Sequence, residues 1–136
     1  MIDDEVHDDE DNRTPLEFFE DGFREFRGGL YFEAHDTWEE FWQRLRGPDR
    51  RFLQALIHLA VGAYHFENGN MHGAKSQWSK SRDKLRPYPP GHWGVDASEW
   101  ITWIELFLQA GASAHFPPNL HFEQRRFPAT FIMAAS

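Results

Sequence analysis

Residues 52–66, FLQALIHLAVGAYHF, are apolar around nearly the whole circumference of a helix. A helix of this kind is stable in water only when other parts of the protein cover it on most sides. We therefore expect a helix over residues 49–67 to be the central element of a domain. The rest of the chain has to supply the elements that surround it.

Four further segments have the periodicity of amphipathic helices and are bounded by Gly or Pro. Thr14 and Glu17 have the spacing of a capping box at the start of the first one. Asp96 is placed to cap the last one. The predicted ranges of these helices are 15–27, 32–46, 71–85 and 97–110.

A shift of 40 residues superimposes several features of the sequence. This register predicts two helical hairpins, each with a small residue and two large residues on one packing face. Arrays of helical hairpins have periods of this size, usually in three or more copies. With only two copies, a chance alignment stays open as the alternative. The matching pairs are Phe26 and Phe66, Gly29 and Gly69, Ala34 and Ala74, Trp38 and Trp78, and Leu45 and Leu85.

These elements predict an all-α protein, a compact five-helix domain over residues 14–111. Seven of the 22 acidic residues fall within the first 11 positions, so most of the net charge of −8 belongs to an acidic segment, residues 1–13, that we expect to be disordered. The remainder, residues 112–136, is interrupted by Pro and rich in Phe. We expect it to be an extended tail that packs on the domain or on a partner.

The composition narrows the cellular setting. The absence of Cys excludes a disulfide framework and thiolate chemistry, and it fits a reducing compartment. No apolar run reaches the roughly 18 residues of a membrane span. These features predict a cytoplasmic protein that does not bind membranes.

Three joined motifs resemble the domain of unknown function 309 family: YFEAHDTWEEFW, FLQALIHLAVGAYHFENGN and GAKSQWSKSRDKL. The resemblance covers about residues 23–88 and implies an all-helical fold with no established activity. Asp36, Ala55 and His58 depart from residues that the family usually has, which are Glu, Gly and Gln. The residues that match the family pattern are His35, Glu39, Trp42, Gln54, His65, Asn70 and Ala74.

Polar side chains on two neighbouring helices are the candidates for a functional site. On a helical wheel, His35, Glu39 and Trp42 lie along the edge of the apolar face of their helix. The central helix has one stripe of polar side chains, Gln54, His58 and His65, with Val61 in the same arc. If the two helices are antiparallel neighbours, these edges face each other. We expect a ligand pocket lined by His35, Glu39, Trp42, Gln54 and His65.

Imidazole nitrogens and a carboxylate are ordinary ligands of divalent transition metals, so His35, Glu39 and His65 are also candidate metal ligands, with His58 a weaker one. The identity of any cofactor is unknown. A spacing of four residues between His35 and Glu39 differs from the Glu-x-x-His motif of many helical-bundle metal sites.

Several functions fit these residues. The first is a binding module that takes a small ligand or a metal. The second is a small hydrolase or lyase, metal-dependent or acid-base, in which Glu39 orients His35 as a general base. The third is a structural protein whose polar groups pair only to fix the helices. The sequence leaves open whether the protein is an enzyme.

Two further features concern macromolecular partners. The last helix and the tail carry enough exposed apolar residues to predict a homo-oligomer interface as an alternative to internal packing. Arg44, Arg46, Arg50 and Arg51 surround one helix turn, where they complement the end of the preceding helix. A nucleic-acid complex is not expected, because the chain carries no further basic stripe.

Overall fold

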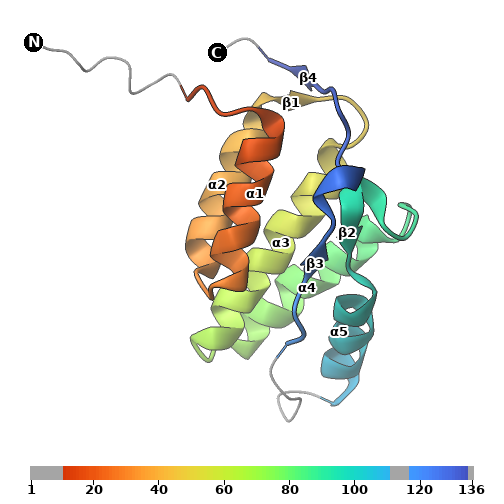
Figure 1. Cartoon of the computed structure of the whole chain (residues 1–136). Coiled ribbons are helices and arrows are strands. Elements are labelled where there is room, and N and C mark those ends of the chain that lie inside the picture. Colours follow the sequence, from red (N-terminus) through yellow and green to blue (C-terminus); the bar gives the residue numbers. More distant parts are fainter. Residues whose placement is uncertain (1–10, 111–116, 135–136) are drawn as a thin grey trace, which may run out of the picture.

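The computed structural model describes residues 11–110 and 117–134, and within them the chain forms five α-helices, two short 3-10 helices and two small antiparallel strand pairs (Figure 1). The all-α prediction is confirmed. The helices are α1 (Pro15–Arg27), α2 (Tyr31–Arg44), α3 (Arg50–Glu67), α4 (Met71–Leu85), η2 (His92–Gly94), α5 (Ser98–Ala110) and η3 (Gln124–Arg126). The strands are β1 (Leu45–Arg46), β2 (Val95–Asp96), β3 (His121–Phe122) and β4 (Ile132–Met133).

The ends of the helices follow from local chemistry. The capping box at the start of α1 is present, with the Thr14 side chain accepting from the Glu17 backbone N–H and the Glu17 side chain accepting from the Thr14 N–H. Asp96 accepts hydrogen bonds from the Ser98 backbone and hydroxyl as α5 begins. α2 ends at Arg44, two residues earlier than expected, because the next two residues pair with β4 as strand β1.

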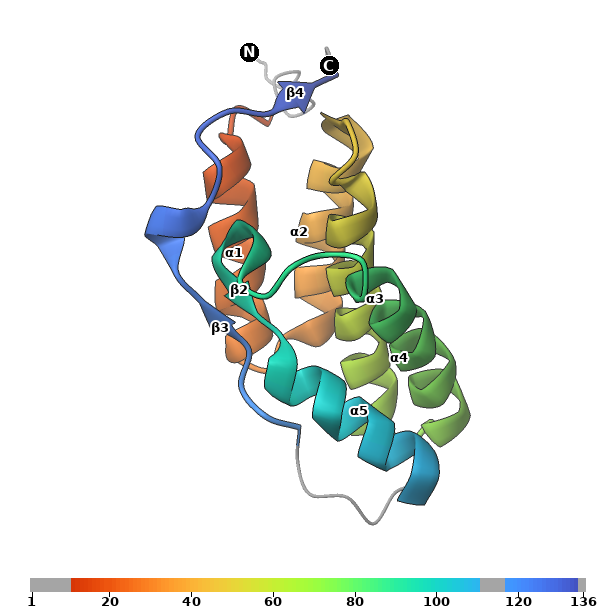
Figure 2. The same cartoon turned by 90° about the vertical axis from the view of Figure 1, so that its right-hand side faces the viewer.

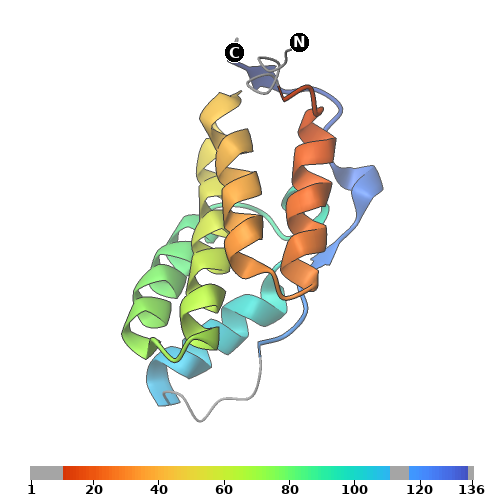
Figure 3. The same cartoon turned by 90° about the vertical axis from the view of Figure 1, so that its left-hand side faces the viewer.

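The elements α1 and α2 form one helical hairpin, and α3 and α4 form a second (Figures 1 and 3). α3 lies between α2 and α4, which confirms its prediction as the central helix. Its buried residues extend from Phe52 to Ala63 and occupy most of its circumference. This position explains why its sequence is apolar on nearly every side.

Each hairpin is closed by an indole that contacts a glycine of the preceding helix. Trp38 of α2 donates a hydrogen bond to the Phe19 carbonyl, and its ring lies where a Cβ atom on Gly22 would be. Trp78 of α4 makes the same bond to the Leu59 carbonyl and covers Gly62. Both tryptophans are fully buried, as the sequence predicted.

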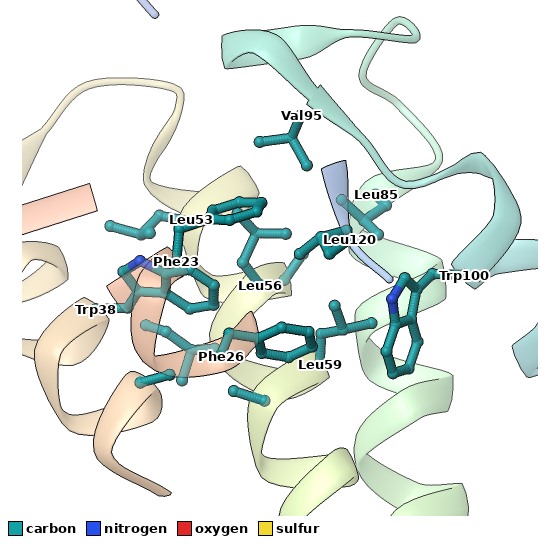
Figure 4. Packing of buried hydrophobic residues seen from close by; sticks show 14 of the residues in the cluster. Phe23, Phe26, Trp38, Leu53, Leu56, Leu59, Leu85, Val95, Trp100 and Leu120 are labelled. Carbon is teal, nitrogen blue, oxygen red and sulfur yellow. The ribbon is translucent and has the colours of Figure 1, made fainter. Parts of the chain in front are cut away.

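α5 packs obliquely across the bundle (Figure 2) and connects the two hairpins through aromatic side chains. The Trp100 ring centroid is 5.7 Å from that of Phe26 in α1 and 5.7 Å from that of Trp78 in α4. Phe26 in turn stacks on Trp38. Figure 4 shows Trp38, Phe26 and Trp100 in this shared core. The core is therefore continuous from one hairpin to the other.

The described part of the tail packs on the same core. β3 pairs with β2 and β4 pairs with β1, so the segment lies along α1 and returns to the end of α2 (Figure 2). Leu120 is buried, and the Phe122 ring contacts Phe19 and Phe23. Internal packing thus occupies apolar residues that were candidates for an oligomer interface; the homo-oligomer itself stays a prediction.

Part of the predicted acidic segment, residues 1–10, and Phe116 of the tail lie outside the described residues. Among the helices that are described, none combines the length and apolar character needed to cross a membrane.

Candidate functional site on helix α2

The polar edge of α2 exists because the opposite face of the helix is committed to the core. Ala34, Trp38 and Phe41 are completely buried. The residues that follow or precede them by one position are turned toward the border of the core and the solvent. His35 and Glu39 occupy this border, and Asp36 is exposed beside His35.

His35 is flanked by one carboxylate at each ring nitrogen. Its Nδ1 atom is 3.3 Å from Asp36 Oδ1, and its Nε2 atom is 3.6 Å from Glu39 Oε1. The imidazole is mostly buried, with 19% of the side chain exposed, whereas Asp36 and Glu39 are 62% and 47% exposed. Burial thus holds the His35 ring in place, while the exposed carboxylates of Asp36 and Glu39 are free to move around it.

The three residues each offer one ligand atom, and these atoms lie within 4.8 Å of one another. The Nδ1 atom of His35 is buried and makes no hydrogen bond among the described residues, since its contact with Asp36 lacks hydrogen-bond geometry. An unsatisfied buried nitrogen costs about 1–3 kcal/mol. Such atoms in native proteins often mark a bound ion or water.

The ring of His35 is held by neighbouring aromatic side chains. Its centroid is 5.3 Å from that of Phe32, and Phe32 is 5.3 Å from Tyr64 of α3. Both Phe32 and Tyr64 are exposed to solvent. These rings form a wall on the α3 side of His35.

The histidines of α3 have partners on the other side of the helix, toward α4. His58 Nδ1 is 2.8 Å from Gln77 Oε1. Burial lowers the pKa of His58, although the bond to Gln77 opposes this shift. His65 Nδ1 is 3.3 Å from the Asn70 amide nitrogen at the start of α4. These contacts join α3 to α4.

Among the described residues, no hydrogen bond, ion pair or ring contact joins Trp42 or Gln54 to His35. The Trp42 indole donates to the Arg50 carbonyl, and the Arg50 guanidinium lies 3.8 Å above its ring. Trp42 therefore fastens the turn between α2 and α3. Gln54 is half-buried on α3. The inclusion of Trp42, Gln54, His58 and His65 in one site with His35 stays a prediction, and Asp36 is the neighbour that the structure adds.

The arginines near that turn bind mainly to backbone carbonyls. Arg44 donates to the Asp11 carbonyl, Arg46 to the Gln43 and Leu45 carbonyls, and Arg50 to the Trp42 carbonyl. Arg51 is exposed. These bonds tie the end of α2 to the segments around it.

A second polar cluster was not recognised in the sequence. Asp49 precedes α3 but does not cap it; its carboxylate accepts instead from Trp93 Nε1 at 3.0 Å and lies 3.2 Å from His92 Nε2. Trp93 is buried in a left-handed conformation with φ 57°. Such strain in a bulky residue needs strong local support. Asp49 and His92 are 43 positions apart, so no local spacing connects them.

Prominent cavities on the described part of the chain lie near the loop 89–97, the tail, α5 and the turn before α3. Neither His35 nor Glu39 lines any of them. The exposure of Asp36 and Glu39 makes the cluster of His35, Asp36 and Glu39, here called the α2 cluster, a surface site, suited to an ion more than to an enclosed organic substrate.

The comparison with known protein families agrees with the resemblance seen in the sequence. The model of the family described as "Domain of unknown function (DUF309)" matches residues 19–77, which run from α1 into α4 and contain the whole α2 cluster. No curated protein matches the chain. The chain is thus similar to the DUF309 family over residues 19–77.

Proposed function

We propose that the protein is a small helical binding module that takes a divalent transition metal at His35, Asp36 and Glu39. The observation that carries the proposal is the convergence of one ring nitrogen and two carboxylates within 4.8 Å on a mostly buried anchor. A mixed nitrogen and oxygen set suits Zn²⁺, Co²⁺, Ni²⁺ or Mn²⁺.

The distance between His35 and Glu39 favours a metal held by this pair. Metal–nitrogen and metal–oxygen bonds are about 2.0–2.2 Å long, which places neighbouring ligand atoms roughly 3 Å apart. The present 3.6 Å separation needs only a small rotation of the exposed Glu39 side chain. Asp36 supplies the third ligand or orients the ring, and water fills the open positions.

The exposure of both carboxylates also limits the strength of the site. Three ligands from a single helix, two of them on exposed side chains, leave the metal partly hydrated. We therefore expect reversible binding rather than the permanent occupancy of a structural zinc site.

Acid-base catalysis by the same His35 and Glu39 pair is the competing function. Catalysis needs a substrate held beside the His35 imidazole. The cavities near the loop 89–97, the tail, α5 and the turn before α3 are lined by residues other than His35 and Glu39. A purely structural role for the pair is the other alternative. Both predict that the pair does not respond to metal ions.

Cobalt titration tests the proposal, because the visible absorption of Co²⁺ reports its ligands directly. We expect saturable binding of Co²⁺ to the wild-type protein. In His35→Asn and Glu39→Gln the dissociation constant should be at least ten times larger. Binding should also weaken as the pH falls, because the histidine nitrogen has to be deprotonated. Zn²⁺ should displace the Co²⁺.

Glu40→Gln is the matched control, since it removes the same charge from an exposed neighbour on the same helix. It should bind Co²⁺ as the wild-type protein does. Equal affinities in wild type, His35→Asn and Glu40→Gln would eliminate the metal site. If His35→Asn lowers stability without changing metal affinity, the structural role is correct instead.

A further inference from the structure

A cavity of about 520 Å³ lies where three segments distant in sequence meet. They are the end of α1, the loop that carries η2, and the part of the tail that contains β3 and η3 (Figure 2). Arg27, His121 and Arg126 contribute basic groups to its lining, and Asp96 and Glu123 contribute carboxylates.

The two carboxylates in the lining are already engaged. Asp96 accepts from the backbone and hydroxyl of Ser98, and these bonds lower the pKa of Asp96. Glu123 is paired with Arg125, with 2.6 Å between Oε2 and Nε. Their negative charge is therefore partly satisfied by groups other than Arg27 and Arg126.

The two guanidinium groups in the lining have no carboxylate partner among the described residues. Arg27 makes only a long contact with the Phe23 ring, 5.8 Å from its centroid. The side chain of Arg126 makes no ion pair or hydrogen bond there. This differs from other arginines of the chain, five of which are paired with carboxylates: Arg13, Arg24, Arg82, Arg86 and Arg125.

The backbone around the cavity is built to bring Arg126 close. Gly91 has φ 77°, and a Cβ atom on it would lie 2.6 Å from Arg126 Nη1 and 3.0 Å from Cζ. The guanidinium therefore lies against the bare backbone of the loop. The Glu123 N–H donates to the Gly94 carbonyl at 2.7 Å, which fixes η3 to the same loop.

The wall of the cavity is also anchored in the core. Phe122 lines it and packs on Phe19 and Phe23 of α1, and β3 pairs with β2. The backbone around the cavity is therefore fixed by packing, which reduces the entropy lost when a ligand binds, while the side chains of Arg27 and Arg126 are exposed.

We propose that this cavity binds the phosphate group of a small phosphorylated molecule, with Arg27 and Arg126 as charge-assisted donors and His121 as a further donor. Planar guanidinium groups match the oxygens of phosphate and bind them in pairs of hydrogen bonds. The volume exceeds what a bare phosphate ion needs and lies within the range of small-ligand pockets. The remaining space accepts an organic part.

Binding of inorganic phosphate to the full chain, followed by calorimetric titration at constant ionic strength, tests this site. We expect saturable binding to the wild-type protein and at least a tenfold loss of affinity in Arg27→Gln and in Arg126→Gln. Arg126→Lys keeps the charge but loses the planar fork, so it should also bind more weakly than wild type. Far-UV circular dichroism verifies that each variant is folded.

Arg51→Gln is the matched control, because it removes an exposed arginine that does not line this cavity. It should bind phosphate as tightly as wild type. Equal losses in Arg51→Gln and Arg126→Gln would show that phosphate responds only to the net positive charge of the protein, and would overturn the proposal. So would succinate binding in place of phosphate, or a folded Arg27→Gln and Arg126→Gln pair with unchanged affinity.

Discussion

His58 shows how burial changes the chemistry of a single side chain. Its ring is half-buried between α3 and α4 and bonded to Gln77. Burial, with smaller contributions from Lys84 and Lys80, lowers the pKa of His58 below its ordinary value of 6.5. The neutral ring is therefore the form that the folded protein favours.

This shift predicts a pH dependence of stability. Above about pH 6.5 the ring is neutral in both states and contributes no pH dependence. As the pH falls below that value, the unfolded chain binds a proton before the folded protein does, so stability is lost until the folded pKa is passed. The loss is small, because the ring is only half-buried and solvent screens part of its charge.

His58→Gln removes the titrating group while keeping a partner for Gln77. Urea unfolding at pH 7.5 and pH 5.0 should therefore show a smaller acid-induced loss of stability in His58→Gln than in wild type. His72→Gln, an exposed change on α4, should behave like wild type. If wild type, His58→Gln and His72→Gln all lose the same stability between pH 7.5 and pH 5.0, burial does not lower the pKa of His58.

The candidate site was predictable from sequence only where its residues share one helix. His35 and Glu39 are one turn apart, so helical geometry alone places them together. His58 and His65 were expected to face α2, but their bonds to Gln77 and Asn70 depend on how far α3 is rotated about its axis. A helix that is apolar all round gives little information about that rotation.

At the scale of elements, the two hairpins are closed by an indole packed on a glycine. A methyl group on Gly22 or Gly62 would overlap the ring of Trp38 or Trp78. Each indole also donates to a backbone carbonyl of the facing helix, so it has little freedom to move. The close approach of the helices depends on these two glycines.

Gly22→Ala and Gly62→Ala should each destabilise the protein by about 1–3 kcal/mol, because overpacking outweighs the gain of about 1 kcal/mol in helix propensity. Urea unfolding measures the change. Gly28→Ala is the control: this residue has φ −85°, and its added Cβ would be 3.4 Å from the nearest atom, the Arg24 carbonyl oxygen. If all three variants are equally stable, the glycines do not set the helix spacing.

The elements themselves were largely predictable because the signals that define them are local. Capping residues, Gly and Pro fixed α1 and α4 at their observed bounds, 15–27 and 71–85. The four short strands were not predicted, since β1 and β4 are brought together from positions almost 90 residues apart. Two-residue strands carry no periodic pattern, and only the folded chain brings them together.

At the scale of the whole molecule, the two hairpins share one aromatic core. Trp100 of α5 lies between Phe26 of the first hairpin and Trp78 of the second, at 5.7 Å from each ring. The tail closes the same core from the other side through Leu120. Since neither hairpin has a core of its own that is separate from the other, we expect the domain to unfold in one step.

Trp100→Ala tests this continuity. Removing a fully buried indole should lower the free energy of unfolding by about 3–5 kcal/mol, and the change should affect both hairpins together. Leu106→Ala on the same helix should cost much less, because Leu106 is 56% exposed. Unfolding followed by far-UV circular dichroism and by tryptophan fluorescence should give coincident transitions in wild type. Separate transitions, or equal costs for the two substitutions, would mean that the hairpins are stabilised independently and that α5 packs on them without joining them.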